Sequence, residues 1–143
     1  MTETEYETLP ELESSETRIG ASTVVMKFGG TSVADPEKIR RVAARLVATK
    51  RAGSRVVAVI SAMGYHTDEL LELAHQVSPR PKPRELDMLI SVGERISCAL
   101  VAMAISDLGT DAISLTGSQA GIVTDTVHGK AKIVEIRAHR IHN

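Results

Sequence analysis

A lysine and two glycines stand at the end of the first apolar segment of the chain. In VVMKFGGTSV, Lys27 closes a run of apolar residues, and Gly29 and Gly30 follow it. Glycines let backbone N–H groups approach an anion closely, and a lysine adds a mobile positive charge suited to phosphate oxygens. The spacing differs from that of a Walker loop, in which the lysine follows the glycines. The pattern therefore indicates either a phosphate site or an ordinary tight turn.

A glutamate interrupts the apolar pattern of a long predicted helix. With Ile90 set at zero and about 100° per residue, Glu94 falls at about 40°, inside the apolar stripe. Its neighbour Arg95 points away, so an ion pair between the two is geometrically poor. An unpaired carboxylate in a core is costly, so we expect Glu94 to meet a charge from another element or from a ligand. Gly93, just before it, lets a neighbouring group approach closely. The stripe comprises Leu86, Ile90, Ser97, Val101, Ala104 and Leu108.

Hydroxyl side chains follow two of the predicted strands. Ser61 ends the second strand and Thr67 begins the helix after it, so both could hydrogen-bond a small polar ligand. Thr67 also suits a plain N-cap of that helix. The loop TGSQAG, residues 116–121, again combines two glycines with two hydroxyls at a strand end. In an open α/β sheet, ligands bind in loops of this kind at the carboxyl ends of the strands.

The elements that would position these residues alternate along the chain. We expect an α/β fold with a mainly parallel sheet sandwiched by helices. The second strand is continuously apolar, which predicts that it is covered on both faces. The expected strands are Thr23–Phe28, Arg55–Ser61, Asp111–Leu115, Ile122–Thr124 and Lys132–Ile136. The expected helices run from Pro36, capped by Asp35, to Gly53, from Thr67 to about Val77, and from about Glu85 to Leu108.

The composition restricts the class of protein. One domain fits 143 residues, of which 43% are hydrophobic. A formal net charge of −1 and only three aromatic residues argue against a nucleic-acid partner. The single cysteine, Cys98, excludes an intramolecular disulfide, and the five histidines show no metal-ligand spacing, so no metal ligand is predicted. Without a long uncharged apolar stretch we expect no membrane span, and we expect a cytoplasmic protein.

The first 22 residues differ in charge from the rest of the chain. They hold six glutamates and one arginine, a charge of −5, whereas residues 23–143 carry a charge of +4. This leader has almost no apolar periodicity, so residues 1–22 are predicted to be a disordered acidic leader. The folded part is then expected over residues 23–143.

Four segments resemble a known family. They read KFGGTSVADPEKIRRVA, VISAMG followed by TDELLELA, ELDMLISVGERIS, and LTGSQAGIVTDTVHGKAKI. In this order they resemble the amino-terminal part of the catalytic domain of aspartokinases, from about Val24 to Ile136. Aspartokinases are amino-acid kinases that use ATP to phosphorylate the β-carboxylate of L-aspartate, the first step towards lysine, threonine and methionine. The resemblance implies an amino-acid kinase-like fold, ATP and Mg²⁺ as cofactors, and L-aspartate as substrate.

The resemblance also implies roles for single residues. Lys27 matches the catalytic lysine that contacts the transferring phosphoryl group, and Gly29 and Gly30 supply the backbone beside the ATP phosphates. Ser61 and Thr67 match hydroxyl positions around the aspartate. Glu94 matches the acid that recognises the α-amino group of the substrate, so that its counter-charge would be the ligand.

Two features depart from the family pattern. Tyr65 and His66 stand where relatives usually carry small or polar residues, which bears on local specificity. The resemblance fades after Ile136, before the family's nucleotide-binding half, so we expect a truncated kinase domain that is inactive by itself. Two alternatives stay open, namely an inactive truncated remnant and an amino-acid kinase that acts on a different acid. For the complete enzyme we expect a homo-oligomer.

Overall fold

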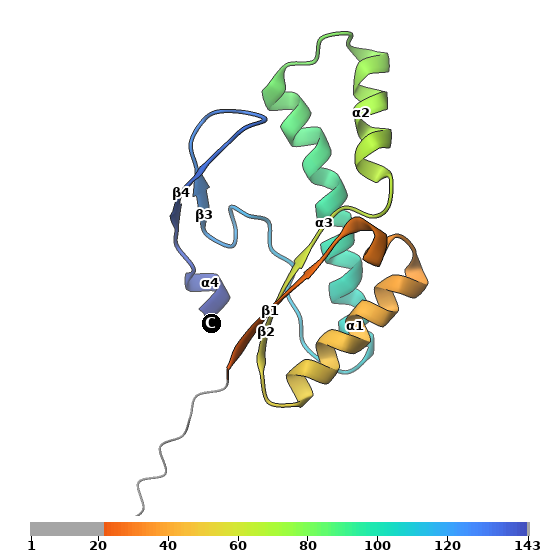
Figure 1. Ribbon diagram of the computed structural model, residues 1–143, viewed down its shortest axis with the longest axis vertical. Helices are drawn as coiled ribbons and strands as arrows, with labels where there is room; N and C mark the ends of the chain where they lie inside the picture. The colour runs from red at the N-terminus through yellow and green to blue at the C-terminus, as the bar shows by residue number, and fades with distance from the viewer. Residues whose placement is uncertain (1–21, 143) are drawn as a thin grey trace, which may run out of the picture.

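Helices and strands alternate in the computed structural model, which describes residues 22–142 (Figure 1). The order confirms the predicted α/β class. The predicted acidic leader, apart from its last residue, lies outside the described residues. The elements are β1 (Thr23–Phe28), the 3-10 turn η1 (Gly30–Val33), α1 (Pro36–Arg51), β2 (Arg55–Ile60), α2 (His66–Val77), α3 (Pro83–Asp107), β3 (Ile122–Thr124), β4 (Ile133–Ile136) and α4 (His139–His142).

The strands β1 and β2 form a parallel pair. Their register runs from Thr23 opposite Arg55 to Phe28 opposite Ile60. Because successive side chains in a strand point to opposite faces, each strand turns every second residue towards the core. The core comprises Phe28, Val33, Ile39, Val42, Leu46, Ile60, Met63 and Val101. The parallel pairing brings the carboxyl ends of both strands to the same edge of the sheet.

The helix α1 begins and ends where the sequence predicts. The Asp35 carboxylate accepts a hydrogen bond from the Lys38 N–H at 2.8 Å, which caps the helix and holds the pKa of Asp35 below its usual value. Gly53 follows the helix with a φ of +95°, a conformation that glycine adopts freely. The buried side of α1 consists of Ile39, Val42, Ala43, Leu46 and Val47, which its helical periodicity predicts.

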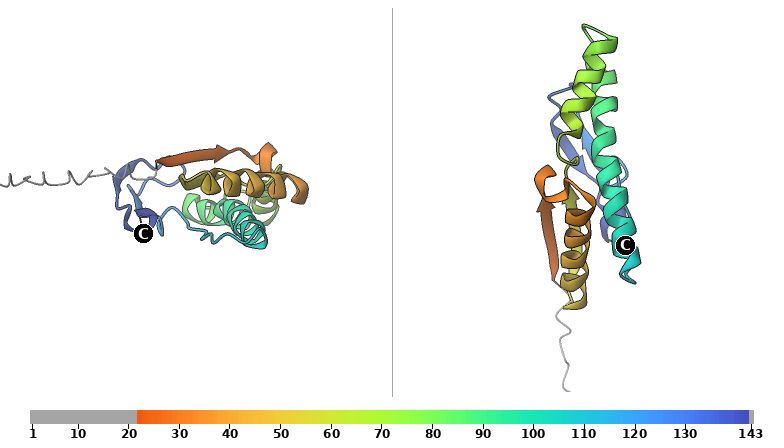
Figure 2. Two further views of the ribbon diagram at one scale, coloured as in Figure 1. Left: turned by 90° about the horizontal axis from the view of Figure 1, so that it is seen from below. Right: turned by 90° about the vertical axis from the view of Figure 1, so that its right-hand side faces the viewer.

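Helices cover one face of the β1–β2 pair. In Figure 2, α1 and α3 lie on the same side of β1. The opposite face carries Val25, which is 66% exposed, and Val59, which is 49% exposed. The prediction that Arg55–Ser61 is covered on both faces is therefore wrong for the described residues. An apolar run is buried on both sides only where a second layer packs on the sheet, and no such layer lies within residues 22–142.

The helices α2 and α3 form a hairpin joined by the proline-rich residues 78–82 (Figure 1). The predicted N-cap at Thr67 is wrong, because α2 begins at His66 and its N-cap position is Tyr65, two residues before Thr67, with no side-chain cap. The helix α3 begins at Pro83, whose missing N–H is not needed in a first turn, and ends before Gly109, whose φ is +72°.

A line of small and medium-sized residues is the buried side of α3. Gly93, Ser97 and Val101 are buried at intervals of four residues, and Val101 belongs to the core that α1 and the strands share. Other apolar side chains of α3 are exposed, namely Met88, Val92, Ile96, Leu100 and Met103. By length and composition alone α3 could cross a membrane, which is weak evidence because core helices pass the same test. The helix contacts α1 and α2.

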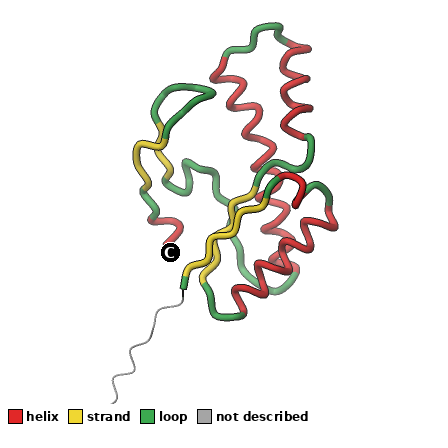
Figure 3. The backbone as a smooth tube through the Cα atoms, in the orientation of Figure 1, coloured by secondary structure: helices red, strands yellow, loops and turns green. Residues whose placement is uncertain are grey.

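The strands β3 and β4 form an antiparallel hairpin separate from the β1–β2 pair (Figure 3). The predicted strand at Ile122–Thr124 is confirmed, and the last predicted strand begins one residue later, at Ile133. Residues 111–115, predicted as a strand, run as a loop between α3 and β3. A strand needs a neighbour for its backbone hydrogen bonds, and no described strand pairs with this segment. The short helix α4 is absent from the predicted elements.

Candidate functional site

Three segments meet at Ala62, in the loop between β2 and α2. A Cβ added to Gly30 would lie 2.7 Å from the Ala62 carbonyl oxygen, and one added to Gly93 would lie 2.8 Å from the Ala62 Cβ. The Gly64 N–H also donates to the Gly30 carbonyl at 3.1 Å. Both glycines therefore permit close packing that a larger residue would disturb. They hold the carboxyl ends of β1 and β2 against the middle of α3.

This packing brings together the three segments of the chain that carry the predicted site residues. They lie in or just after β1, on either side of the β2–α2 loop, and one residue beyond Gly93 on α3. The residues are Lys27, Gly29, Gly30, Ser61, Thr67 and Glu94. The parallel strand pair and the two glycine contacts place these segments next to one another, and the roles of the six residues remain predictions.

Lys27 and Gly29 are both exposed. Lys27 lies on the uncovered face of β1, and it forms no salt bridge with any residue that the structure describes. Gly29 has an ordinary extended φ of −75°, and a Cβ there would meet nothing within 4 Å. Neither backbone strain nor crowding in the described residues therefore demands a glycine at position 29. The space in front of its backbone is open to a ligand.

Ser61 and Thr67 are half-buried on either side of the β2–α2 loop. The Ser61 backbone N–H donates to the Phe28 carbonyl at 3.0 Å, which ties this loop to β1. The two hydroxyls form no hydrogen bond within residues 22–142, and no side chain caps α2. Hydroxyls and the free N–H groups of a helix start are donors that suit a carboxylate. Tyr65, in the same loop, is 79% exposed.

Glu94 is exposed, so the prediction that it lies in a core is wrong. The buried line of α3 passes through Gly93, and a residue one position further is turned by about 100°. Because α3 is apolar around much of its circumference, its periodicity did not identify the side that α1 covers. Glu94 forms no salt bridge with Arg95 or with any other described residue.

The charge of Glu94 acts on a thiol one helical turn away. Cys98 is half-buried, and this burial, together with the negative charge of Glu94, raises the pKa of the Cys98 thiol. Cys98 therefore reports on the charge at Glu94. Cys98 also lies on α3 between the side that is exposed and the side that packs on other elements.

The loop TGSQAG uses its polar groups for its own structure. The Thr116 N–H donates to Gln119 Oε1 at 3.0 Å, and the Gln119 N–H donates to Thr116 Oγ1 at 3.2 Å. Gly121 has a φ of +83°, and a Cβ there would lie against the carbonyl of Arg137. These contacts give residues 116–121 a structural role in the described chain.

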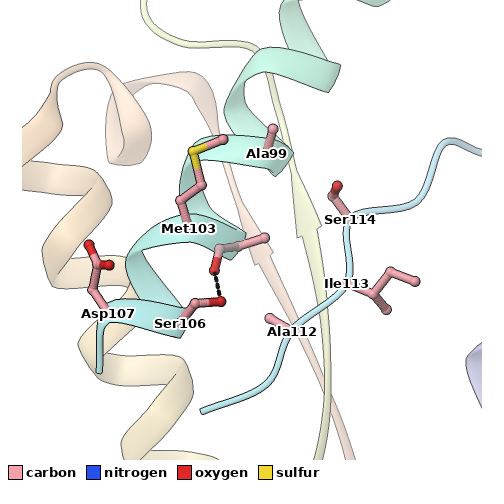
Figure 4. A pocket seen from close by; sticks show the side chains of 8 residues that line it. Ala99, Met103, Ser106, Asp107, Ala112, Ile113 and Ser114 are labelled. Carbon is pink, nitrogen blue, oxygen red and sulfur yellow. Dashed lines mark hydrogen bonds between the residues drawn. The ribbon is translucent and has the colours of Figure 1, made fainter. Parts of the chain in front are cut away.

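A cavity lies beside the carboxyl-terminal half of α3. It is an open hollow of about 460 Å³ between the last turns of α3 and residues 112–114, lined by Ala99, Met103, Asp107 and Ile113 among others (Figure 4). None of the predicted site residues lines it. One of its polar groups, the Ser106 hydroxyl, donates to the Ala102 carbonyl at 3.1 Å. The candidate site is therefore the region around Ala62 and not this cavity.

The sequence model described as the amino acid kinase family matches residues 22–143. This match covers all of the described residues, including the six predicted site residues. It agrees with the parallel strand pair and helices described above.

Individual relatives are aspartokinases. Those of Mycolicibacterium smegmatis and Corynebacterium glutamicum are 62% and 59% identical over 120 and 118 residues, which cover 84% and 82% of this chain. A crystal structure of aspartate kinase from Synechocystis shares 51% sequence identity with a TM-score of 0.68, over 72% of this chain and 18% of that chain. The chain spans 28% of the length of these two curated relatives.

Proposed function

Because this chain belongs to the amino acid kinase family, we propose that it forms the substrate-binding part of an aspartate kinase. In this reaction ATP donates its γ-phosphoryl group to the β-carboxylate of L-aspartate, which gives 4-phospho-L-aspartate and ADP. The similarity to aspartokinases at 59–62% identity supports the choice of substrate. Since the chain spans 28% of these relatives, the proposal concerns the site around Ala62 and not a whole kinase.

One observation carries the proposal. The packing of Gly30 and Gly93 on Ala62 joins the segment that carries a cation, Lys27, to the segment that carries an anion, Glu94, and neither side chain has an ion-pair partner among the described residues. L-Aspartate bears one ammonium and two carboxylates. Glu94 complements the ammonium, and the hydroxyls of Ser61 and Thr67 complement a carboxylate. Lys27 is then available to contact the transferring phosphoryl group.

The proposed chemistry needs positioning and charge neutralisation. An oxygen of the β-carboxylate attacks the γ-phosphorus in line, a new O–P bond forms, and the bond from the γ-phosphorus to the bridging oxygen breaks as ADP leaves. Lys27 and the backbone N–H groups of Gly29 and Gly30 would neutralise the charge on the transferring group. No covalent intermediate with the enzyme is required.

Mg²⁺ accompanies ATP in kinase reactions, and the described residues do not form a complete set of ligands for it. Residues 22–142 contain no group of three or more His, Cys, Asp or Glu side chains that could hold a metal ion. Kinase sites hold Mg²⁺ with one or two carboxylates together with the phosphates of ATP, so the ion would be bound along with the nucleotide. The proposed roles of Lys27 and Glu94 involve no step through the metal.

The uncovered apolar face of the sheet bears on the activity of the 143-residue chain. Val25 and Val59 expose apolar surface beside Lys27. We therefore predict that the isolated chain binds L-aspartate weakly and does not turn over. A homo-oligomeric complete enzyme and a cytoplasmic location stay predictions, the latter supported by a single cysteine without a disulfide.

Calorimetric titration of the purified chain with L-aspartate tests the proposal. We expect saturable binding, which Glu94→Gln reduces at least tenfold and which Asp107→Asn, at the far end of α3, leaves unchanged. L-Glutamate tests the alternative of a different acid. A folded chain, judged by circular dichroism, that binds no L-aspartate at millimolar concentration would overturn the proposal.

A second assay addresses turnover. Acyl phosphate formed from ATP and L-aspartate is trapped with hydroxylamine and measured as the hydroxamate. We expect no signal above background from the isolated chain. A signal that depends on both substrates would overturn the predicted inactivity and would still support the kinase assignment.

A further inference from the structure

We propose that Asp87 is a positioning residue that holds the β3–β4 loop, residues 125–132, along the side of α3 that carries Glu94, and that this loop closes one side of the aspartate site. The inference rests on the proposed function. It adds a residue that the sequence pattern did not single out and that lies outside the contacts around Ala62.

Two hydrogen bonds join this loop to α3, and both end on the same oxygen. Oδ2 of Asp87 accepts from the Gly129 N–H at 3.0 Å and lies 3.1 Å from His128 Nδ1. Asp87 is separated from these partners by 41 and 42 residues. A carboxylate that accepts from a backbone N–H and an imidazole forms charge-assisted bonds, which are stronger than neutral ones.

A second carboxylate shapes the loop that Asp87 holds. Oδ1 of Asp125 accepts from the Val127 N–H at 3.1 Å and from the Lys132 N–H at 3.2 Å, which closes the base of the loop. Gly129 has a φ of +74°, a left-handed conformation that turns its N–H towards Asp87. The loop therefore has a defined shape and presents two neighbouring donors to one acceptor.

The strand β4 contributes little hydrophobic packing to the position of the hairpin. All four residues of β4 are exposed, among them Ile133 and Val134 at 60% and 63%. The strands β3 and β4 contact each other far more than they contact any other helix or strand. Figure 1 shows the β3–β4 connection reaching towards the first turns of α3. Because few other contacts hold the hairpin, its place beside α3 depends strongly on Asp87.

The helix geometry places this loop on the same side as the proposed aspartate site. Asp87 and Glu94 are seven residues apart, so they point in directions about 20° apart and lie about 10 Å from each other along the helix axis. Glu94 therefore faces the side on which the loop approaches α3. A loop already held there loses less conformational entropy when a ligand binds between it and α3.

Asp87→Asn and His128→Ala test the inference in the 143-residue chain. Amide hydrogen exchange of residues 125–132 reports on the loop, and titration with L-aspartate reports on the site. We expect exchange at Gly129 to be about tenfold faster in Asp87→Asn, with aspartate affinity lowered about fivefold to tenfold. His128→Ala keeps the Gly129 bond, so its effects should be smaller and in the same direction. Asp107→Asn, an exposed acid on α3 without contact to the loop, serves as the control.

The outcomes separate this inference from the proposed function. If the unsubstituted chain binds no L-aspartate, both are overturned. If it binds L-aspartate and Asp87→Asn binds it equally well, the positioning role is overturned and the proposed function stands. Unchanged exchange in the loop of Asp87→Asn also overturns the inference. A purely structural role would lower the melting temperature of Asp87→Asn and leave the affinity of the folded protein unchanged, which also counts against positioning.

Discussion

Gly93 on α3 lies so close to Ala62 that a Cβ at position 93 would stand 2.8 Å from the Ala62 Cβ. This contact joins the loop after β2 to the turn of α3 that carries Glu94. Within a helix a glycine costs about 1 kcal/mol relative to alanine. The close approach to Ala62 explains why a glycine is nevertheless placed there.

Gly93→Ala should destabilise the fold by about 1 kcal/mol, although alanine is the better helix former. The gain in helix propensity is about 1 kcal/mol, whereas overpacking of a close contact costs about 1–3 kcal/mol. Urea unfolding monitored by circular dichroism measures the difference. In the double variant Ala62→Gly with Gly93→Ala, part of the loss should be recovered, since the clashing methyl is gone. Strictly additive effects of the two substitutions would show that this contact does not limit the packing.

Lys27→Ala, introduced into a complete enzyme that contains this segment, should lower kcat by about a hundredfold to a thousandfold. The proposed lysine acts on charge that develops during phosphoryl transfer, so the KM for L-aspartate should change little. Steady-state kinetics with both substrates varied gives the two constants. Lys27→Arg keeps the charge and should retain part of the activity. An unchanged kcat in Lys27→Ala would rule out the transition-state role.

Glu94→Gln in the same enzyme should raise the KM for L-aspartate by roughly tenfold to a hundredfold, the loss expected for one charge-assisted hydrogen bond. Its kcat at saturating L-aspartate should fall much less, because the α-amino group does not react. The KM for ATP serves as an internal control and should stay constant. Equal KM values for L-aspartate in both proteins would remove Glu94 from the site.

The Cys98 thiol should react with iodoacetamide only at higher pH than an unhindered cysteine does. Burial and the charge of Glu94 raise the pKa of Cys98 above its ordinary value of 9.0, so less thiolate is present at any pH below it. In Glu94→Gln one of the two causes disappears, the pKa falls, and alkylation at pH 8 becomes faster. Mass spectrometry of the modified chain at several pH values gives both profiles. Superimposable profiles would mean that Glu94 does not act on Cys98.

Local signals in the sequence were sufficient for the parts of the fold that form from neighbouring residues. The strand Thr23–Phe28 and the five buried residues of α1 follow from side-chain periodicity, and the start of α1 follows from Asp35 and Pro36. The KFGG segment was likewise recognisable as a strand end with exposed backbone. These features depend on residues a few positions apart, whose interactions are the same in any fold that contains them.

Contacts between distant segments required the tertiary structure. The periodicity of α3 placed Glu94 in a core, and the packing on α1 instead buries Gly93, Ser97 and Val101 and leaves Glu94 exposed. The predicted strand at residues 111–115 has no described partner, and pairing is a property of two segments, not one. No pattern in the sequence indicates that Asp87 accepts a hydrogen bond from the N–H of Gly129, which is 42 residues away. A helix with apolar residues around most of its surface can pack in several ways, and only its neighbours decide which side is covered.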